Sequence, residues 1–198
     1  MKSRALAISG SWVIDLYIHS DARGSFEEWF RADVASQLLG RNWVTAQANT
    51  SHSHHGVIRG VHYALVPPGQ AKWVTCVAGA IRDFVIDIRP DSPTYGQHEE
   101  VPLSATAGRC VLISEGLGHA FVVDSETATV SYLLNAPYQP DREFGINVFD
   151  PDLRLPWNVD NPVVSDRDRE APTLAEAQAM GRLPTLAAYH ELSSTTRD

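Results

Sequence analysis

The stretch GVIRGVHYALVPPGQAKWVTC, residues 56–76, decides the fold, because it reads as two apolar β-strands interrupted by polar side chains. Strict alternation would put Arg59 and His62 on opposite faces of the first strand. Gly60 lies between them and can host a β-bulge that turns one of the two side chains. Lys72 lies at the start of the second strand. Polar groups within apolar strands predict that one face of this sheet lines a site.

The pattern of short strands continues outward from this stretch, from residue 5 to about residue 150. Runs of β-branched and aromatic residues are separated by Gly, Pro, Asn, Asp or Ser. Ten strands are predicted, over residues 12–19, 43–51, 56–65, 71–80, 81–90, 98–105, 109–115, 119–125, 128–135 and 145–150. So many strands in so short a span predict an all-β fold, a barrel or a double-sheet jelly roll, since closure protects strand edges.

Helical signals are few. The segment SFEEWFRADVASQLLG, residues 25–40, has apolar residues at four-residue steps and ends at Gly40, a typical helix C-cap residue. It therefore predicts a helix. Near the end of the chain, residues 171–192 predict one or two short helices interrupted at Gly181 and Pro184.

The size of the chain favours a single domain. Its 198 residues, 43% of them hydrophobic and 20% charged, can bury one substantial core. We expect one jelly-roll domain over residues 1–198, with its core at about 5–157 and a helical tail at 158–198. The last residues of this tail, 193–198, are predicted to be disordered.

Charge and cysteine usage limit the partners and the location. A formal net charge of −8 argues against binding nucleic acid or an anionic membrane, which relies on clustered Lys and Arg. No stretch approaches the ~20 apolar residues of a membrane span, and residues 1–15 lack the apolar core of a signal peptide. Cys76 and Cys110 lie in apolar runs and are expected to be buried, reduced thiols. These features predict a cytoplasmic protein.

Polar residues within apolar runs recur along the chain and predict a lined cavity. Besides His62, they are Lys72, Asp83, His119 and Tyr132. A barrel of this size can enclose one small ligand. A histidine held by a carboxylate is a general base near neutral pH, a lysine stabilises a developing oxyanion, and a tyrosine supplies a proton. Together these groups can remove and return a proton next to a carbonyl.

Other chemistries find less support. Three histidines crowd into HSHH, residues 52–55, but this segment is predicted to be a loop whose side chains splay apart. A metal site needs three or four convergent ligands, and a charged lysine is a poor one, so we expect no metal. A Gly-x-Ser-x-Gly elbow for nucleophilic hydrolysis is missing, as is a Gly-rich nucleotide loop.

An ordered set of motifs resembles one family. The segments include DARGSFEEWF, QANTSHS, GVIRGVHY, LISEGLGHAF, YLLNAPYQP, FDPDLRLPW and SDRDREAP, from about residue 21 to about residue 172. In order and spacing they resemble the dTDP-4-dehydrorhamnose 3,5-epimerases and the related 3-epimerases of antibiotic deoxysugar pathways. The resemblance implies a cupin-like jelly roll that works as a homodimer without metal or organic cofactor. It also implies dTDP-4-keto-6-deoxy-glucose as the substrate.

The resemblance further implies a role for each catalytic residue. His62 would take the proton alpha to the 4-keto group, with Asp168 as its orienting partner. Lys72 would face the enolate oxygen, and Tyr132 would return a proton from the opposite side of the ring. Without the resemblance, Asp168 in the charged run SDRDRE reads as an ordinary surface residue.

Binding residues are implied in the same way. Arg59 and His119 would hold the diphosphate and the sugar, and Tyr138 would lie near the ring or the nucleotide. The implied nucleotide-site residues, the first three of them donated across the dimer, are Arg23, Phe26, Glu28, Gln47 and Asn49. Asp83 matches a polar strand position whose role the resemblance leaves open.

Two positions depart from the family pattern. Leu117 stands where an aromatic residue is common, and Ala120 stands where glycine is usual. A changed cavity would favour inversion at carbon 3, with carbon 5 left open because Tyr132 is present. Two alternatives share the scaffold, a dTDP-sugar 3,4-ketoisomerase and a sugar-nucleotide-binding jelly roll, because fold alone does not determine function. A metalloenzyme is a third.

Overall fold

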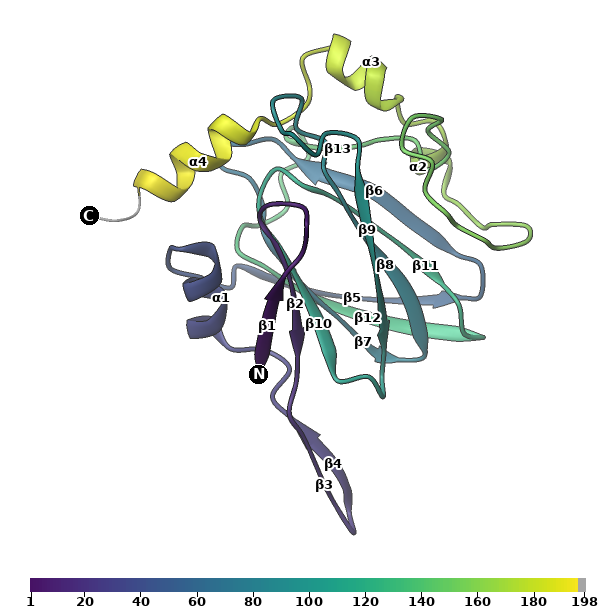
Figure 1. Cartoon of the computed structure of the whole chain (residues 1–198). Coiled ribbons are helices and arrows are strands. Elements are labelled where there is room, and N and C mark those ends of the chain that lie inside the picture. Colours follow the sequence, from purple (N-terminus) through teal and green to yellow (C-terminus); the bar gives the residue numbers. More distant parts are fainter. Residues whose placement is uncertain (196–198) are drawn as a thin grey trace.

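Two stacked antiparallel β-sheets form the body of the molecule (Figure 1). The computed structural model describes residues 1–195. The larger sheet has the strand order β1 (Lys2–Ala5), β2 (Ser11–Asp15), β10 (Arg109–Ile113), β7 (Lys72–Ala78), β12 (Thr127–Leu134) and β5 (Gln47–His54). The smaller sheet has the order β13 (Glu143–Gly145), β6 (Ile58–Ala64), β11 (Gly118–Val123), β8 (Ala80–Ile86) and β9 (His98–Ser104). This architecture agrees with the predicted all-β double-sheet jelly roll.

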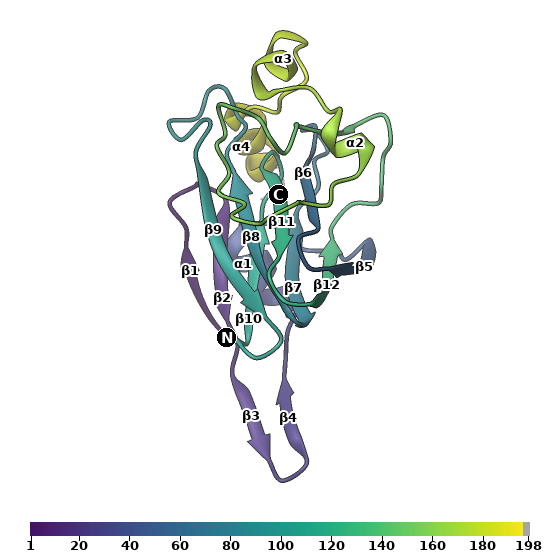
Figure 2. The ribbon, with the colours of Figure 1, turned by 90° about the vertical axis from the view of Figure 1, so that its right-hand side faces the viewer.

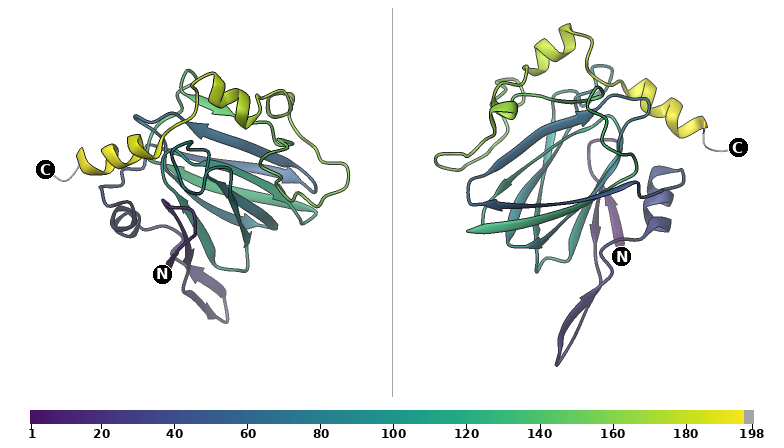
Figure 3. Two further views of the ribbon diagram at one scale, coloured as in Figure 1. Left: turned by 45° about the horizontal axis from the view of Figure 1, so that its top comes forward. Right: turned by 180° about the vertical axis from the view of Figure 1, so that it is seen from behind.

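Smaller elements lie at opposite ends of this body. A two-stranded hairpin, β3 (Ile18–Asp21) and β4 (Gly24–Glu27), projects away from the two sheets (Figure 2). The tail helices α2 (Asp166–Arg169), α3 (Leu174–Ala179) and α4 (Leu186–Thr195) lie at the other end (Figure 3). None of the helices described is long and apolar enough to cross a membrane.

The central strands of both sheets are buried on both faces. Aliphatic side chains such as Val74 and Val85 fill the space between the sheets. On the outer face of the smaller sheet, Phe84 packs edge to face against Trp157, with ring centroids 5.1 Å apart. On the outer face of the larger sheet, the fully buried Trp73 packs with helix α1 (Ala32–Leu39). Strands covered on both sides read as continuous apolar runs, which explains why their alternation is weak.

Helix α1 is shorter than predicted. The segment 25–40 is helical only from Ala32, because residues 25–27 pair with β3 in the hairpin. The hairpin turn is stabilised by Asp21, whose Oδ1 accepts the backbone N–H of Arg23 at 2.8 Å. The predicted C-cap is confirmed, since Gly40 has the left-handed φ of +70°.

Several strand boundaries differ from the prediction. The predicted strand 12–19 is two strands, with β2 ending at Asp15 and β3 beginning at Ile18. Strand β1 was not predicted, and only the first residue of the predicted strand 145–150 belongs to β13. At that point Asn147 turns the chain, because its side-chain oxygen accepts the N–H of Phe149 at 2.8 Å. Short side-chain contacts of this kind end a strand where hydrophobicity alone would continue it.

The tail forms two predicted helices and one that was not predicted. Helices α3 and α4 are separated at Gly181 and Pro184 as expected. Helix α2 was not predicted because its sequence has no apolar periodicity. The predicted disorder of 193–198 is wrong as far as Thr195, which ends α4, and the remainder lies outside the described residues.

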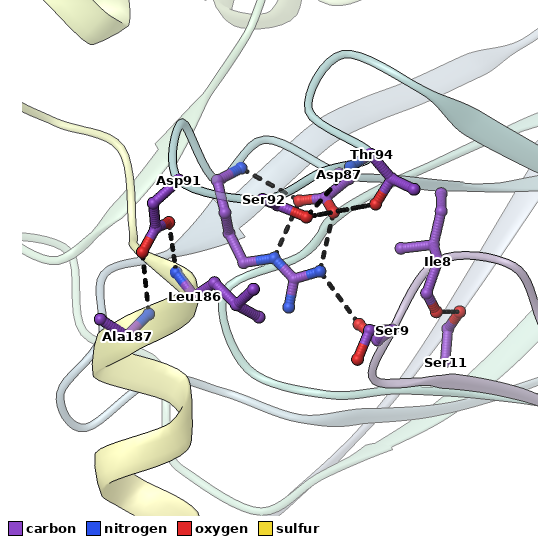
Figure 4. A network of polar contacts seen from close by, with 10 residues as sticks. Ile8, Ser9, Ser11, Asp87, Asp91, Ser92, Thr94, Leu186 and Ala187 are labelled. Atoms are coloured by element: carbon purple, nitrogen blue, oxygen red, sulfur yellow. Dashed lines mark hydrogen bonds and ion pairs between the residues drawn. The ribbon is translucent and has the colours of Figure 1, made fainter.

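Polar contacts join the start of α4 to the segment that follows β8. Figure 4 shows Asp91 accepting the backbone N–H groups of Leu186 and Ala187 at 2.6 and 3.0 Å, at the start of the helix. Next to it, the fully buried Arg89 guanidinium donates to both oxygens of Asp87 at 2.8 Å. The carboxylate of Asp91 thus satisfies N–H groups that the first turn of a helix leaves unpaired.

Candidate active site

Two adjoining pockets lie between residues of the two sheets. Their volumes are about 210 Å³ and 120 Å³, and both are lined by His62, Lys72 and Tyr132. His62 comes from β6 of the smaller sheet, whereas Lys72 and Tyr132 come from β7 and β12 of the larger sheet. Three residues predicted to act on the substrate therefore surround one cavity.

A β-bulge turns Arg59 and His62 toward the same pocket. Across β11, His62 pairs with His119 and Arg59 pairs with Phe121, so β6 has one extra residue between these two pairs. Both side chains line the smaller pocket. The bulge predicted at Gly60 is confirmed, and it removes the conflict that strict alternation would create.

Replacing Gly60 with alanine is expected to lower the free energy of unfolding by about 3 kcal/mol or more, since overpacking and backbone strain add. Gly60 has a φ of +123°, and an added Cβ would lie 2.5 Å from the Ala120 Cβ and 2.6 Å from the His119 carbonyl oxygen. Chemical denaturation measures the change.

The matched control for this prediction is Gly96→Ala. Gly96 also has a positive φ, +76°, but an added Cβ would meet nothing within 4 Å. Its cost is therefore backbone strain alone, about 1 kcal/mol. Equal losses for the two variants would contradict the close packing at the bulge.

His62 is held by Asp168 from the distant tail. The Nε2 atom of His62 lies 2.7 Å from Oδ1 of Asp168. Ser165, the N-cap of α2, accepts the backbone N–H of Asp168 and so fixes the start of this short helix. Burial raises the pKa of Asp168, but hydrogen bonds from His62 and Ser165, together with the charge of His62, outweigh it and hold the pKa below its usual value. Asp168 is therefore an ionised, accepting partner.

Lys72 is a buried cation at the start of β7. Only 7% of its surface is exposed. Burial lowers its pKa to about 8, although the nearby carboxylates of Glu143 and Asp83 act in the opposite direction. A lysine in this environment is still protonated at neutral pH and can donate to a developing oxyanion.

Tyr132 faces the pocket from the sheet opposite His62. In β12 it pairs with Asn49 on one side and with Val74 on the other. Its ring packs against the core between the sheets. A small ring bound between the sheets would therefore meet an imidazole on one side and a phenol on the other.

A second histidine and carboxylate pair lies beside the first. The Nε2 atom of His119 is 2.6 Å from Oδ2 of the fully buried Asp83. His119 lines the smaller pocket with Arg59, whose Nε donates to Ser53 Oγ at 3.1 Å. The structure thus gives Asp83, whose role the sequence left open, a contact with His119.

Residues from β5 and from the loop that follows β12 also line the larger pocket. Gln47, Asn49 and the half-exposed Tyr138 are all among its lining residues. The side chain of Gln47 donates to Asn49 Oδ1 at 2.9 Å and accepts the backbone N–H of Tyr138 at 2.8 Å. One glutamine thereby connects the strand to the loop.

The remaining predicted binding residues do not join this pocket. Arg23, Phe26 and Glu28 lie on or next to the projecting hairpin and are exposed, Phe26 to 67%. Arg23 pairs with Asp21 at 2.6 Å instead. Within one chain, Arg23 and Phe26 line a different pocket from His62.

Seven residues that line the two pockets are not predicted as site residues from the sequence. They are Ser51, Gln70, Phe121, Leu134, Glu143, Phe144 and Arg167. Gln70 donates from Nε2 to Glu143 Oε1 at 3.1 Å. The polar Gln70 inside an apolar stretch was a visible signal, whereas Glu143 and Arg167 lie in charged segments that look like ordinary surface.

The sequence predicts a loop for the histidine cluster, which is wrong up to His54, the last residue of β5. His52 and His54 are exposed on the same face of the strand, and His55 Nδ1 contacts the Asp124 carbonyl oxygen at 3.0 Å. In residues 1–195, no group of three or more His, Cys, Asp or Glu side chains could hold a metal ion.

The two departures from the family pattern lie in the core. Leu117 is 2% exposed and packs between the sheets, and it lines neither of the two pockets. Ala120 is fully buried beneath the Gly60 bulge. The expectation that Leu117 changes the cavity is therefore not supported by its position.

Comparison with known proteins gives a consistent picture. A family model described as dTDP-4-dehydrorhamnose 3,5-epimerase matches residues 5–176. A dTDP-4-dehydrorhamnose 3,5-epimerase of Mycolicibacterium smegmatis is 47% identical over 197 residues, covering 100% of this chain and 98% of the relative. A dTDP-4-dehydro-6-deoxyglucose 3-epimerase of a Streptomyces species is 46% identical over 187 residues, covering 94% and 95%.

A solved structure extends the likeness to the fold. The 3'-monoepimerase ChmJ of Streptomyces bikiniensis, in complex with dTDP-quinovose, superposes with a TM-score of 0.93 at 45% identity. The match covers 97% of this chain and 98% of that chain. From the extent of these matches, the chain belongs to the dTDP-4-dehydrorhamnose 3,5-epimerase family.

Proposed function

We propose that this protein epimerises dTDP-4-keto-6-deoxy-glucose at carbon 3, by removing the proton alpha to the ketone and returning one to the opposite face. The observation that carries this proposal is the arrangement of three groups around one cavity. His62, held by Asp168 of α2, lies on one sheet, and Lys72 and Tyr132 lie on the other. These side chains supply a base, an electrophile and an acid.

His62 is the proposed base. Because Asp168 is ionised and can only accept, the Nε2 atom of His62 carries the proton in their 2.7 Å contact. This leaves Nδ1 unprotonated and free to take the alpha proton. As the imidazole becomes cationic, the carboxylate stabilises it and so strengthens the base.

Lys72 is the proposed electrophile. An alpha proton next to a ketone is too weakly acidic for an isolated imidazole, so the enolate must be stabilised by several kcal/mol. A buried ammonium group does this well, because little water competes for the oxyanion. The cation needs no reorganisation when the negative charge develops.

Tyr132 is the proposed acid. One histidine cannot both remove a proton and deliver it to the opposite face of the ring. A phenol from the facing sheet supplies the second proton carrier that inversion requires.

Carbon 3 is the position that the proposal commits to. The names of both relatives described above include inversion at carbon 3, whereas only one of them includes carbon 5. Leu117 lines neither pocket, so it gives no reason to exclude inversion at carbon 5. The experiment that follows tests carbon 5 as well as carbon 3.

The test is to incubate the protein with dTDP-4-keto-6-deoxy-glucose in deuterated water. We expect deuterium at carbon 3 with inversion, read by NMR carbon by carbon, because the returned proton comes from a group that exchanges with solvent. Label at carbon 5 as well would extend the activity to that carbon. Folded protein that introduces no label at either carbon would refute the proposal.

We further propose that the enzyme works as a homodimer in which hairpin β3–β4 reaches the partner's pocket. Support comes from the exposure of Arg23 and Phe26 at a place remote from His62. A large exposed aromatic ring on a projecting hairpin is suited to a protein interface.

A cytoplasmic location is inferred from Cys76 and Cys110, which are buried free thiols.

A further inference from the structure

The carboxylate of Asp83 has no part in the mechanism proposed so far. It lies on β8 with no exposed surface, in contact with a pocket residue. Its Oδ2 atom is 2.6 Å from His119 Nε2. Its Oδ1 atom has no hydrogen-bond partner among the side chains and backbone that the structure describes. One oxygen of a buried carboxylate is thus left without a direct contact.

Such a carboxylate is costly unless a nearby positive charge compensates it. Holding His119 does not require the charge, because a neutral amide oxygen would accept the same N–H. His119 compensates this charge only when it is protonated, and Lys72 is a second cation at the same pocket. Lys72 is buried, it lines the smaller pocket with His119, and the negative charge of Asp83 raises its pKa, against the larger lowering by burial.

We infer that Asp83 is a positioning residue with two tasks: its Oδ2 orients His119 toward the pocket, and its negative charge keeps Lys72 in the ammonium form. This inference rests on the role proposed above for Lys72. Asp83 itself acts through its two neighbours and does not line either pocket.

Other charged groups also surround Lys72, and the inference has to hold in their presence. The titratable and charged side chains that line its two pockets are Arg59, His62, His119, Tyr132, Tyr138, Glu143 and Arg167. Glu143 is the one carboxylate among them, and its charge also raises the pKa of Lys72. Asp83 is therefore one of two anions that counter burial.

The sign of the effect follows from this arrangement. The pKa of Lys72 is about 8, so the ammonium form is lost as the pH rises through that value. The negative charge of Asp83 raises the pKa of Lys72, and removing that charge removes this effect. The pKa of Lys72 then falls further, and the cation is lost at lower pH.

The test is Asp83→Asn, which keeps an oxygen to accept from His119 and removes only the charge. The chain has just two lysines, Lys2 and Lys72, so NMR of isotope-labelled lysine side chains resolves the titration of Lys72 directly. Lys2→Arg assigns the two signals. We expect the midpoint of Lys72 to fall by about one pH unit, and the alkaline limb of kcat to move by the same amount.

The matched control is Asp87→Asn. Asp87 directly follows β8 and is as fully buried as Asp83, but its carboxylate is paired with Arg89. We expect this variant to be less stable while the midpoint of Lys72 stays at its wild-type value. A purely structural role for Asp83 predicts the same result for Asp83→Asn, and an unchanged midpoint in that variant overturns the inference.

A second variant and a titration without substrate keep the test decisive. If Asp83→Asn does not fold, Asp83→Ser removes the same charge with a smaller side chain, and the same fall in the Lys72 midpoint is expected. The titration of Lys72 is read without substrate, so it does not depend on turnover. A shifted midpoint in a protein without epimerase activity would sustain the electrostatic role while refuting the proposed function.

Discussion

Replacing His62 with asparagine is expected to reduce epimerisation by about 1,000-fold or more, the upper part of the range for general acid and base catalysis. Asparagine keeps the polarity and much of the volume of the side chain but has no basic nitrogen. The alpha proton then has no acceptor, and both the label from deuterated water and the inverted product are lost. NMR of the product in deuterated water measures both losses together.

His52→Asn is the control for the loss of a histidine. His52 is exposed on β5 and lines neither pocket, so its replacement is expected to leave the rate unchanged. Near-normal inversion by His62→Asn would contradict the proposed base. Movement of the keto group between carbons 3 and 4 in that variant would point to the ketoisomerase alternative.

Replacing Tyr132 with phenylalanine is expected to separate proton exchange from inversion. His62 is intact in this variant, so the alpha proton is still removed. Without the phenol, the only proton carrier is on the face from which the proton left. We expect deuterium to enter carbon 3 with its configuration retained, while inversion falls by at least about 100-fold. NMR reads both the label and the configuration of carbon 3.

Tyr95→Phe is the matched control for the loss of a phenol. The Tyr95 hydroxyl donates to Gln178 at 2.8 Å, away from the two pockets, so inversion is expected at the wild-type rate. Wild-type inversion by Tyr132→Phe would remove the phenol from the mechanism. Loss of exchange as well as inversion would mean that Tyr132 acts before the enolate forms.

The position of these groups on facing sheets explains how the fold makes inversion possible. His62 and Tyr132 lie on strands that belong to different sheets, with the packed core between those sheets. Closely packed sheets hold such groups at a fixed separation, and catalysis depends on that geometry. A site built on one strand or one loop could not contact both faces of a sugar ring.

Local patterns in the sequence were sufficient for much of the architecture. Apolar runs bounded by turn residues located most of the strands, and Gly40 and Gly60 indicated a helix end and a bulge because only glycine adopts their backbone angles easily. The predictions failed where side-chain contacts override propensity. The hairpin at Asp21 and the turn at Asn147 are of this kind.

The two histidine–carboxylate pairs could not be predicted in this way, because their members lie far apart along the chain. His62 and Asp168 are 106 positions apart, and His119 and Asp83 are 36 apart. Only the resemblance to known epimerases singled out Asp168, and Glu143 was not recognised at all. Hydrophobic periodicity is a property of neighbouring residues, so it carries no information about such partners.

The sequence by itself therefore determined the strands, the bulge that turns His62, and the residue types available for moving a proton. Only the tertiary structure decided which carboxylate meets which histidine, and how far burial depresses the pKa of Lys72. The physical reason is the distance along the chain over which each interaction acts. Backbone sterics and hydrophobic patterning act between neighbours, whereas hydrogen bonds, charge and desolvation depend on what folding brings together.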